Sequence, residues 1–206
     1  FQALRAHADS QPEALAICDD SRLITWGQLA QAVGRAAAGF AAGPQTVGLQ
    51  LTGIDYAIAD LAATLAGCRV VPVPGFFSPA QIAHLMQDAG AELVSDLPQA
   101  GRAMALNYAG GAERVIYTSG TTGRPKGVVL GDRQIAASLA GLAAALLPGP
   151  ADRYLSVLPQ AQLLEQICGL FLPILAAAPS IISREAGASL FNGDGRALAR
   201  IALATR

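Results

Sequence analysis

The chain has 206 residues, of which 52% are apolar and 14% charged, and its formal net charge is −1. This composition is typical of a globular protein with a substantial core and excludes a disordered chain. Lysine and arginine form no basic stripe, which argues against nucleic acid as a partner. The sequence has three cysteines, Cys18, Cys68 and Cys168, which lie far apart and form no C-x-x-C pair. This spacing argues against a zinc site or a disulfide framework. We interpret them as small buried apolar residues in a reducing compartment, not as reactive thiols.

Helical and strand patterns alternate through the first part of the chain. An amphipathic helix is predicted to open the sequence and to end at Pro12, where the proline ring breaks the pattern. Thr25 and Gln28 have the spacing of a capping box, so they predict the first turn of a second helix, which ends near Gly43. The other elements predicted here are a hairpin over residues 15–26, a strand over 46–51, a helix over 54–68 and a strand over 69–75.

The same alternation continues to the end of the chain. Ser78 and Pro79 predict the start of a helix that stops at Gly90. Asp132 is expected to cap the helix that follows it. Residues 97–112 have no clear period and are interpreted as a surface connection. The remaining predictions are strands over 91–96, 114–119, 127–130, 154–159 and 180–183, and helices over 133–147, 163–178 and 196–206.

Repeated strand and helix units with apolar, β-branched strands predict an α/β fold, in which helices cover both faces of a mostly parallel sheet. We find no linker that marks a second domain. The longest uncharged segments, 134–151 and 166–183, are interpreted as buried helix plus strand, since a spanning helix needs about 20 predominantly apolar residues. With no signal peptide and no membrane span, the protein is expected to be cytoplasmic.

Three single residues outside the glycine-rich stretch are interpreted as structural. Trp26 is expected to pack in the core, and His84 to lie in the core or at its rim instead of acting as a base. Arg114 could reach a phosphate, but we expect it to be solvated at the surface. The sequence also shows no pair of carboxylates arranged for acid–base catalysis.

Residues 117–128, "YTSGTTGRPKGV", form a glycine- and hydroxyl-rich stretch between two predicted strands. Glycine lets the backbone approach a ligand closely, and a row of N–H and O–H donors suits an anion. Lys126 adds a compact positive charge, which makes phosphate the favoured anion. The alternative is a surface turn, which the same residue types also build. The stretch is not a Walker A loop, a dinucleotide fingerprint or a nucleophile elbow, because the required glycines are misplaced.

"YTSGTTGRPKGV" resembles the phosphate-loop motif of the adenylate-forming (AMP-binding) superfamily, which comprises acyl- and aryl-CoA synthetases, peptide synthetase adenylation domains and luciferases. Three further segments resemble motifs of the same family in the same order: "PEALAICDDSRLITWGQL", "LAGCRVVPV" and "LPQAQLLEQICGLFLPILAAA". The resemblance spans nearly the whole chain. It implies that residues 1–206 are the N-terminal part of an AMP-binding domain, with the C-terminal half and the lid domain further along.

The resemblance implies a reaction in which a carboxylic acid attacks the α-phosphate of ATP. The acyl-adenylate then passes its acyl group to a thiol of CoA or of the phosphopantetheine on a carrier protein. Lys126 and Thr118 would be the catalytic residues, with Mg²⁺ sharing the charge of the departing pyrophosphate and Thr122 near the metal. The residues that would contact the phosphates are Thr118, Ser119, Gly120, Thr121, Thr122, Gly123 and Lys126.

The segment "LPQAQLLE" departs from the family pattern L-P-x-A-H-x-x-E. Gln162 stands where many members have a histidine or aromatic residue in the acyl pocket, and Gln160 replaces a commonly apolar residue, whereas Glu165 matches. Gln162 and Glu165 are therefore the predicted pocket residues, although Gln162 could instead be a solvated turn residue.

A fatty or aryl acid–CoA ligase is the favoured function. The alternatives are an amino-acid-activating adenylation domain and a non-catalytic nucleotide-binding relative. The family motifs that bind adenine, ribose and magnesium, and the mobile lysine, are expected beyond Arg206. We therefore expect residues 1–206 alone to bind polyphosphate weakly without completing adenylation.

Overall fold

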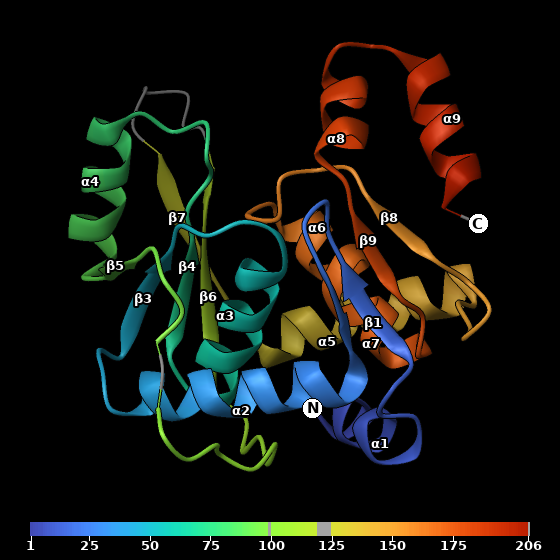
Figure 1. Ribbon diagram of the computed structural model, residues 1–206. Helices are drawn as coiled ribbons and strands as arrows, with labels where there is room; N and C mark the ends of the chain where they lie inside the picture. The colour runs from blue at the N-terminus through green and yellow to red at the C-terminus, as the bar shows by residue number, and fades with distance from the viewer. Residues whose placement is uncertain (99, 119–124, 206) are drawn as a thin grey trace.

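The computed structural model describes residues 1–98, 100–118 and 125–205. Strands within these ranges form a four-stranded and a five-stranded sheet, which lie side by side (Figure 1). The four-stranded sheet has the order β2 (Leu23–Thr25), β1 (Leu15–Cys18), β9 (Ser180–Ile182), β8 (Tyr154–Ser156). The five-stranded sheet has the order β5 (Glu92–Val94), β3 (Thr46–Leu49), β4 (Arg69–Pro72), β6 (Glu113–Thr118), β7 (Lys126–Gly131).

Neighbouring strands are parallel except in the two hairpins, β1–β2 and β6–β7. The helices are α1 (Gln2–Ser10), α2 (Trp26–Ala41), α3 (Gly53–Leu65), α4 (Pro79–Ala89), α5 (Asp132–Leu146), α6 (Leu163–Gln166), the π-helix η1 (Ile167–Phe171), α7 (Leu172–Ala176), α8 (Arg184–Phe191) and α9 (Gly195–Ala204). The predicted α/β class with mostly parallel strands is confirmed. The division of the strands between two sheets was not predicted.

Helix α3 lies at the centre of the molecule, between the two sheets (Figure 1). Most of its side chains are buried around the whole circumference, including Ile54, Tyr56 and Leu61, as is typical of a helix with protein on all sides. Helix α2 packs against it through an apolar face that includes Trp26, so the prediction that Trp26 packs is confirmed. Helix α4 covers the other face of the five-stranded sheet, where Leu85 meets Val71, Val115 and Tyr117.

The predicted starts of helices α2 and α4 are confirmed. In both, the N-cap side chain bonds to a residue three positions later in the sequence. Thr25 accepts a hydrogen bond from the backbone of Gln28, whose side chain accepts one from the backbone of Thr25. Ser78 and Gln81 form the same box at the start of α4, and Gly90 ends that helix in the left-handed conformation.

Two expectations about α5 are wrong. Asp132 does not cap the helix: it is the first helical residue, and its carboxylate accepts hydrogen bonds from the Tyr108 hydroxyl and the Gly111 N–H. Nor is α5 buried, since none of its residues is fully enclosed and Leu146 is 61% exposed. Within the described residues, no helix combines the length and apolar character needed to cross a membrane.

Candidate functional site

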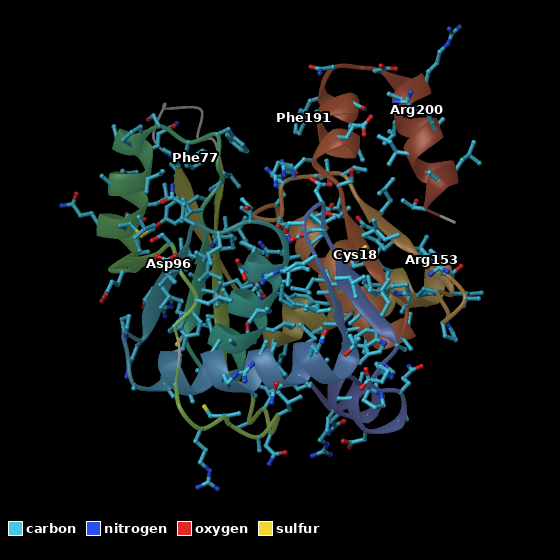
Figure 2. All side chains as sticks on the ribbon, in the orientation of Figure 1. Cys18, Phe77, Asp96, Arg153, Phe191 and Arg200 are labelled. Atoms are coloured by element: carbon cyan, nitrogen blue, oxygen red, sulfur yellow. The ribbon has the colours of Figure 1, made fainter. Side chains whose placement is uncertain are left out.

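A cavity of about 800 Å³ lies between the two sheets, at the carboxyl ends of their parallel strands. We call it the valley. The loops that follow β1, β3, β4, β8 and β9 all contribute to its lining, and Phe191 of α8 stands at its rim (Figure 2). Ligands of open α/β sheets bind outside the carboxyl ends of the strands, because the loops there converge. The valley is therefore the candidate ligand site. Its lining comes from segments 19–22, 50–55, 156–161 and 182–191, together with Val73 and Gly75.

Strand β6 ends at Thr118 and β7 begins at Lys126, both at the same edge of the five-stranded sheet, and most of the glycine-rich stretch lies between these two residues in the sequence. Thr118 and Lys126 are paired across this hairpin and are both solvent-exposed. The neighbouring strand β4 runs parallel to β6, and its loop supplies Val73 and Gly75 to the valley. Thr118 and Lys126 thus lie one strand away from the valley wall and do not line the cavity itself. The other residues predicted to contact phosphate or magnesium lie outside the described residues, and their roles stay predictions: Ser119, Gly120, Thr121, Thr122 and Gly123.

Helix α4 holds the base of this hairpin. The Tyr117 hydroxyl donates a hydrogen bond of 2.6 Å to Asp88, and a ring nitrogen of His84 lies 3.3 Å from the carbonyl oxygen of Pro125. Burial and the hydrogen bond to Asp88 raise the pKa of Tyr117, so this hydroxyl stays protonated at neutral pH. A side chain at Gly127 would lie 2.7 Å from Val115 Cγ1, which explains the glycine there. His84 is half-buried at the rim of the core, as predicted.

The loop after β8 forms one wall of the valley, and Glu165 supports it from behind. Glu165 is 2% exposed, and its Oε2 accepts hydrogen bonds from the Leu158 N–H at 3.3 Å and the Tyr154 hydroxyl at 3.2 Å. Its Oε1 is buried without a hydrogen-bond partner among the described residues. Burial raises the pKa of this carboxyl against the opposing hydrogen bonds. Glu165 therefore faces the interior, not the cavity.

Gln162 occupies the N-cap position of α6, and its side chain makes no capping hydrogen bond. It is not among the described residues that line the valley. Contact of Gln162 or Glu165 with a substrate stays a prediction.

A buried ion pair joins β6 of the five-stranded sheet to helix α3. The Arg114 guanidinium, 5% exposed, binds both carboxylate oxygens of Asp60, at 2.5 and 2.7 Å. It also donates to Thr64 and to Gln166, and its carbon lies 4.9 Å from the centre of the Phe171 ring. The expectation that Arg114 is solvated at the surface is therefore wrong. Burial alone would lower the pKa of Arg114, but the adjacent Asp60 carboxylate outweighs this and raises it, so the guanidinium stays charged.

The β1–β2 turn forms the rim that connects the sheets. Asp19 accepts hydrogen bonds from the backbone N–H groups of Ser21, Arg22 and Ile54, the last at the start of α3. Partial burial acts to raise the pKa of Asp19, but these bonds and one from the Ser21 hydroxyl lower it to about 2. The next residue, Asp20, pairs with Arg184 at 3.1 Å on the opposite side of the rim.

Asp19 is expected to make stability depend on pH between about 4 and 2. Its pKa is lower in the folded state than its ordinary value of 3.8, so its contribution is complete above that value and is lost as the pH falls toward 2. Allowing for solvent screening, we expect about 1 kcal/mol. Unfolding free energies measured from pH 6 to pH 2 should fall less steeply below pH 4 for Asp19→Asn than for the unchanged protein. Identical slopes would contradict this role.

The three cysteines are unsuited to chemistry as thiolates. Burial raises the pKa of Cys68, Cys18 and Cys168, with nearby carboxylates adding to the shift for the last two. Cys68 is buried, whereas the other two are half-buried. In the part of the chain that the structure describes, no group of three His, Cys, Asp or Glu side chains is placed to hold a metal ion.

The sequence pattern of AMP-binding enzymes matches residues 4–107 and 114–197, which together include the strands of both sheets and most of the valley lining. The chain belongs to the AMP-binding enzyme family. The resemblance of the four sequence segments to this superfamily is thereby confirmed.

Several members of the AMP-binding family are similar to this chain over part of their length. FR901469 synthetase from a Dothideomycetidae species is 33% identical over 179 residues, which cover 72% of this chain and 1% of that protein. Sulfoacetate–CoA ligase from Cupriavidus necator is 27% identical over 218 residues, which cover 85% of this chain and 43% of the ligase. The chain therefore spans less than half of either protein.

Solved structures of family members share the fold. o-Succinylbenzoate CoA synthetase from Bacillus subtilis, in complex with its acyl-adenylate intermediate, superposes with a TM-score of 0.76 at 21% identity. The match covers 95% of this chain and 59% of that enzyme. A nonribosomal peptide synthetase, FmoA3, gives a TM-score of 0.74 at 20% identity, over 88% of this chain and 22% of that protein.

Reasoning from the sequence predicts the two strands that flank the glycine-rich motif of this AMP-binding chain but misses the residues that join the valley walls. Asp19 falls within the predicted hairpin over residues 15–26 without a further role, and Gln160 is interpreted only as a departure from the family pattern. Besides the local bonds of Asp19 to Ser21 and Arg22, each of these two side chains accepts a hydrogen bond from a backbone N–H at the start of α3, far away in the sequence. No local spacing connects them, so a single sequence carries no signal for these contacts.

Proposed function

We propose that the protein uses ATP to activate a carboxylic acid and then transfers the acyl group to a thiol. A carboxylate oxygen would attack the α-phosphorus of ATP while the bond to the β-phosphate breaks, giving an acyl-adenylate and pyrophosphate. The thiol of CoA or of a carrier protein's phosphopantetheine would then attack the acyl carbon and release AMP. The observation that carries this proposal is the position of Thr118 and Lys126, paired across a hairpin that carries the family's phosphate-loop sequence at the carboxyl edge of the sheet.

In this proposal, the exposed Lys126 ammonium balances the charge of the leaving pyrophosphate, and the Thr118 hydroxyl donates to a phosphate oxygen. Gly120 and Gly123 would let the backbone approach the phosphates, while Ser119, Thr121 and Thr122 would donate hydrogen bonds. Mg²⁺ would arrive with ATP, neutralise phosphate charge and lie close to Thr122. The hairpin is suited to these tasks because α4 fixes its base through Tyr117 and Asp88.

Two observations bear on the acid and on the thiol. Similarity to sulfoacetate–CoA ligase over 85% of the chain supports an acid–CoA ligase. A fatty or aryl acid is the substrate class that we favour from the sequence motifs, and this comparison does not test it. Similarity to gramicidin S synthase 2 from Brevibacillus brevis, 29% identical over 149 residues, supports the second candidate, an amino-acid-activating adenylation domain that loads a carrier protein.

The test is exchange of labelled pyrophosphate into ATP by the full-length protein, with panels of fatty, aryl and amino acids. We expect exchange that depends on one class of acid and on Mg²⁺, followed by thioester formation with CoA or with a carrier protein. Exchange driven by amino acids would select the second candidate. Binding of ATP without exchange by any acid would identify a non-catalytic nucleotide-binding relative, and failure to bind ATP would contradict the proposal.

A further inference from the structure

Gln160 joins the two walls of the valley through its side-chain amide. Its Oε1 accepts a hydrogen bond of 2.7 Å from the Gly53 N–H, and its Nε2 donates one of 3.1 Å to the Gly53 carbonyl. Gln160 belongs to the loop after β8 in the four-stranded sheet, and Gly53 follows β3 in the five-stranded sheet. Both residues line the valley. One side chain thus pairs with both backbone groups of a residue on the opposite wall.

Gly53 is a position where the backbone needs to be held. It begins α3 with a φ of +64°, in the left-handed region, and a side chain there would lie 2.7 Å from a carboxylate oxygen of Asp19. The N-cap residue Thr52 makes no side-chain hydrogen bond to the helix. The first two N–H donors of α3 are instead bound from the other sheet, that of Gly53 by Gln160 and that of Ile54 by Asp19.

The loop that carries Gln160 is itself held by buried side chains. Glu165 accepts from the Leu158 N–H, and the Gln166 amide donates to the Ala161 carbonyl at 3.1 Å. Gln166 is in turn bound by Arg114, on the strand that leads to the phosphate-loop hairpin. Gln160 therefore extends from a fixed loop, so its bonds to Gly53 can set the spacing of the walls.

We propose that Gln160 is a positioning residue of the AMP-binding site, which fixes the separation of the valley walls through Gly53. Both ends of its amide are engaged by Gly53, so it acts on a bound ligand through the wall and not by contact. The expected effect of Gln160 on ATP binding rests on the proposed function. The pair of hydrogen bonds between Gln160 and Gly53, which we call the bridge, does not. This role would explain why Gln160 stands at a position that is commonly apolar in the family.

The test compares Gln160→Leu and Gln160→Glu in the full-length protein by amide hydrogen exchange at Gly53 and by calorimetric titration with ATP and Mg²⁺. Leucine removes both bonds, so we expect exchange at Gly53 to accelerate about tenfold and ATP affinity to fall about tenfold, as a preorganised wall is lost. Glutamate keeps an acceptor for the Gly53 N–H, so protection there should be retained. The matched control for amide hydrogen exchange is Gln162→Leu, two residues further along the chain, which should leave the Gly53 N–H protected from exchange.

The two measurements test the Gln160–Gly53 hydrogen bonds and their effect on ATP affinity separately. Unchanged exchange at Gly53 in Gln160→Leu would overturn the bridge. Faster exchange with unchanged ATP affinity would overturn the positioning role and leave only a structural contact. If the unchanged protein failed to bind ATP, the proposed function and the positioning role would both fall, whereas the exchange result would still show whether Gln160 holds Gly53.

Discussion

Replacing Arg114 with alanine is expected to lower the free energy of unfolding by about 3–5 kcal/mol. The change leaves the Asp60 carboxylate, 0% exposed, without its counter-ion, and it removes the hydrogen bonds from Arg114 to Thr64 and Gln166. Removing one partner of a buried ion pair is strongly destabilising, because it leaves the other charge buried and uncompensated. Replacing both partners by apolar residues of similar size costs far less. Urea unfolding followed by circular dichroism would measure the difference.

The neighbouring strand pair offers a matched control. Arg69 binds Glu113, the residue before Arg114, but both side chains are partly exposed, at 46% and 39%. Arg69→Ala should therefore cost no more than about 1 kcal/mol. The double variant Arg114→Met with Asp60→Leu should recover most of the stability, because it removes both charges. A loss for Arg114→Ala no larger than that for Arg69→Ala would show that the pair is not buried in solution.

Replacing Lys126 with alanine is expected to reduce pyrophosphate exchange by the full-length protein at least about tenfold, equivalent to about 1.4 kcal/mol of transition-state stabilisation. The lost ammonium is the charge proposed to face the leaving pyrophosphate. Lys126 is solvent-exposed at the start of β7, so its removal should leave the unfolding free energy nearly unchanged. Exchange assays at saturating acid and ATP, together with urea unfolding, would separate the two effects.

Two comparisons sharpen the test of Lys126. Lys126→Arg keeps the charge but not the compact ammonium, so it should retain more activity than alanine. Arg133→Ala removes an exposed cation from the first turn of α5, seven residues after Lys126, and should leave pyrophosphate exchange within about twofold. Lys126 is also the only lysine among the 206 residues, so mass spectrometry of the peptide that contains it, after treatment with an amine-specific reagent, can report on its protection by ATP. Unchanged exchange in Lys126→Ala would remove Lys126 from the proposed site.

Features that depend on neighbours in the sequence could be predicted. The capping boxes of α2 and α4 need only residues three apart, such as Thr25 and Gln28, so their side chains meet whenever the helix forms. The hairpin that carries the phosphate-loop sequence was predicted for a similar reason, because the two strands flank a short connection. The family resemblance followed from this local order of residues.

Features that depend on the packing of distant segments could not be predicted. An arginine is usually exposed, and only the presence of Asp60 on α3 makes the burial of Arg114 tolerable. Asp132 has the residue type of a helix cap, but the Tyr108 hydroxyl provides a competing partner from the preceding connection. The pairing of Gln160 with Gly53 likewise appears only after both sheets are assembled.

The parallel pairing of β1 with β9 constrains the order in which the molecule can be made. Ile17 lies opposite Ser180, so β1 must wait until residues 180–182 are synthesised before it can pair with β9. All five strands of the other sheet lie between these two in the sequence and can assemble first on the ribosome. Until β9 arrives, the edge of β1 that β9 will cover is open, and an open strand edge is a place where a nascent chain can aggregate. A chaperone that binds the emerging protein would be most useful during that interval.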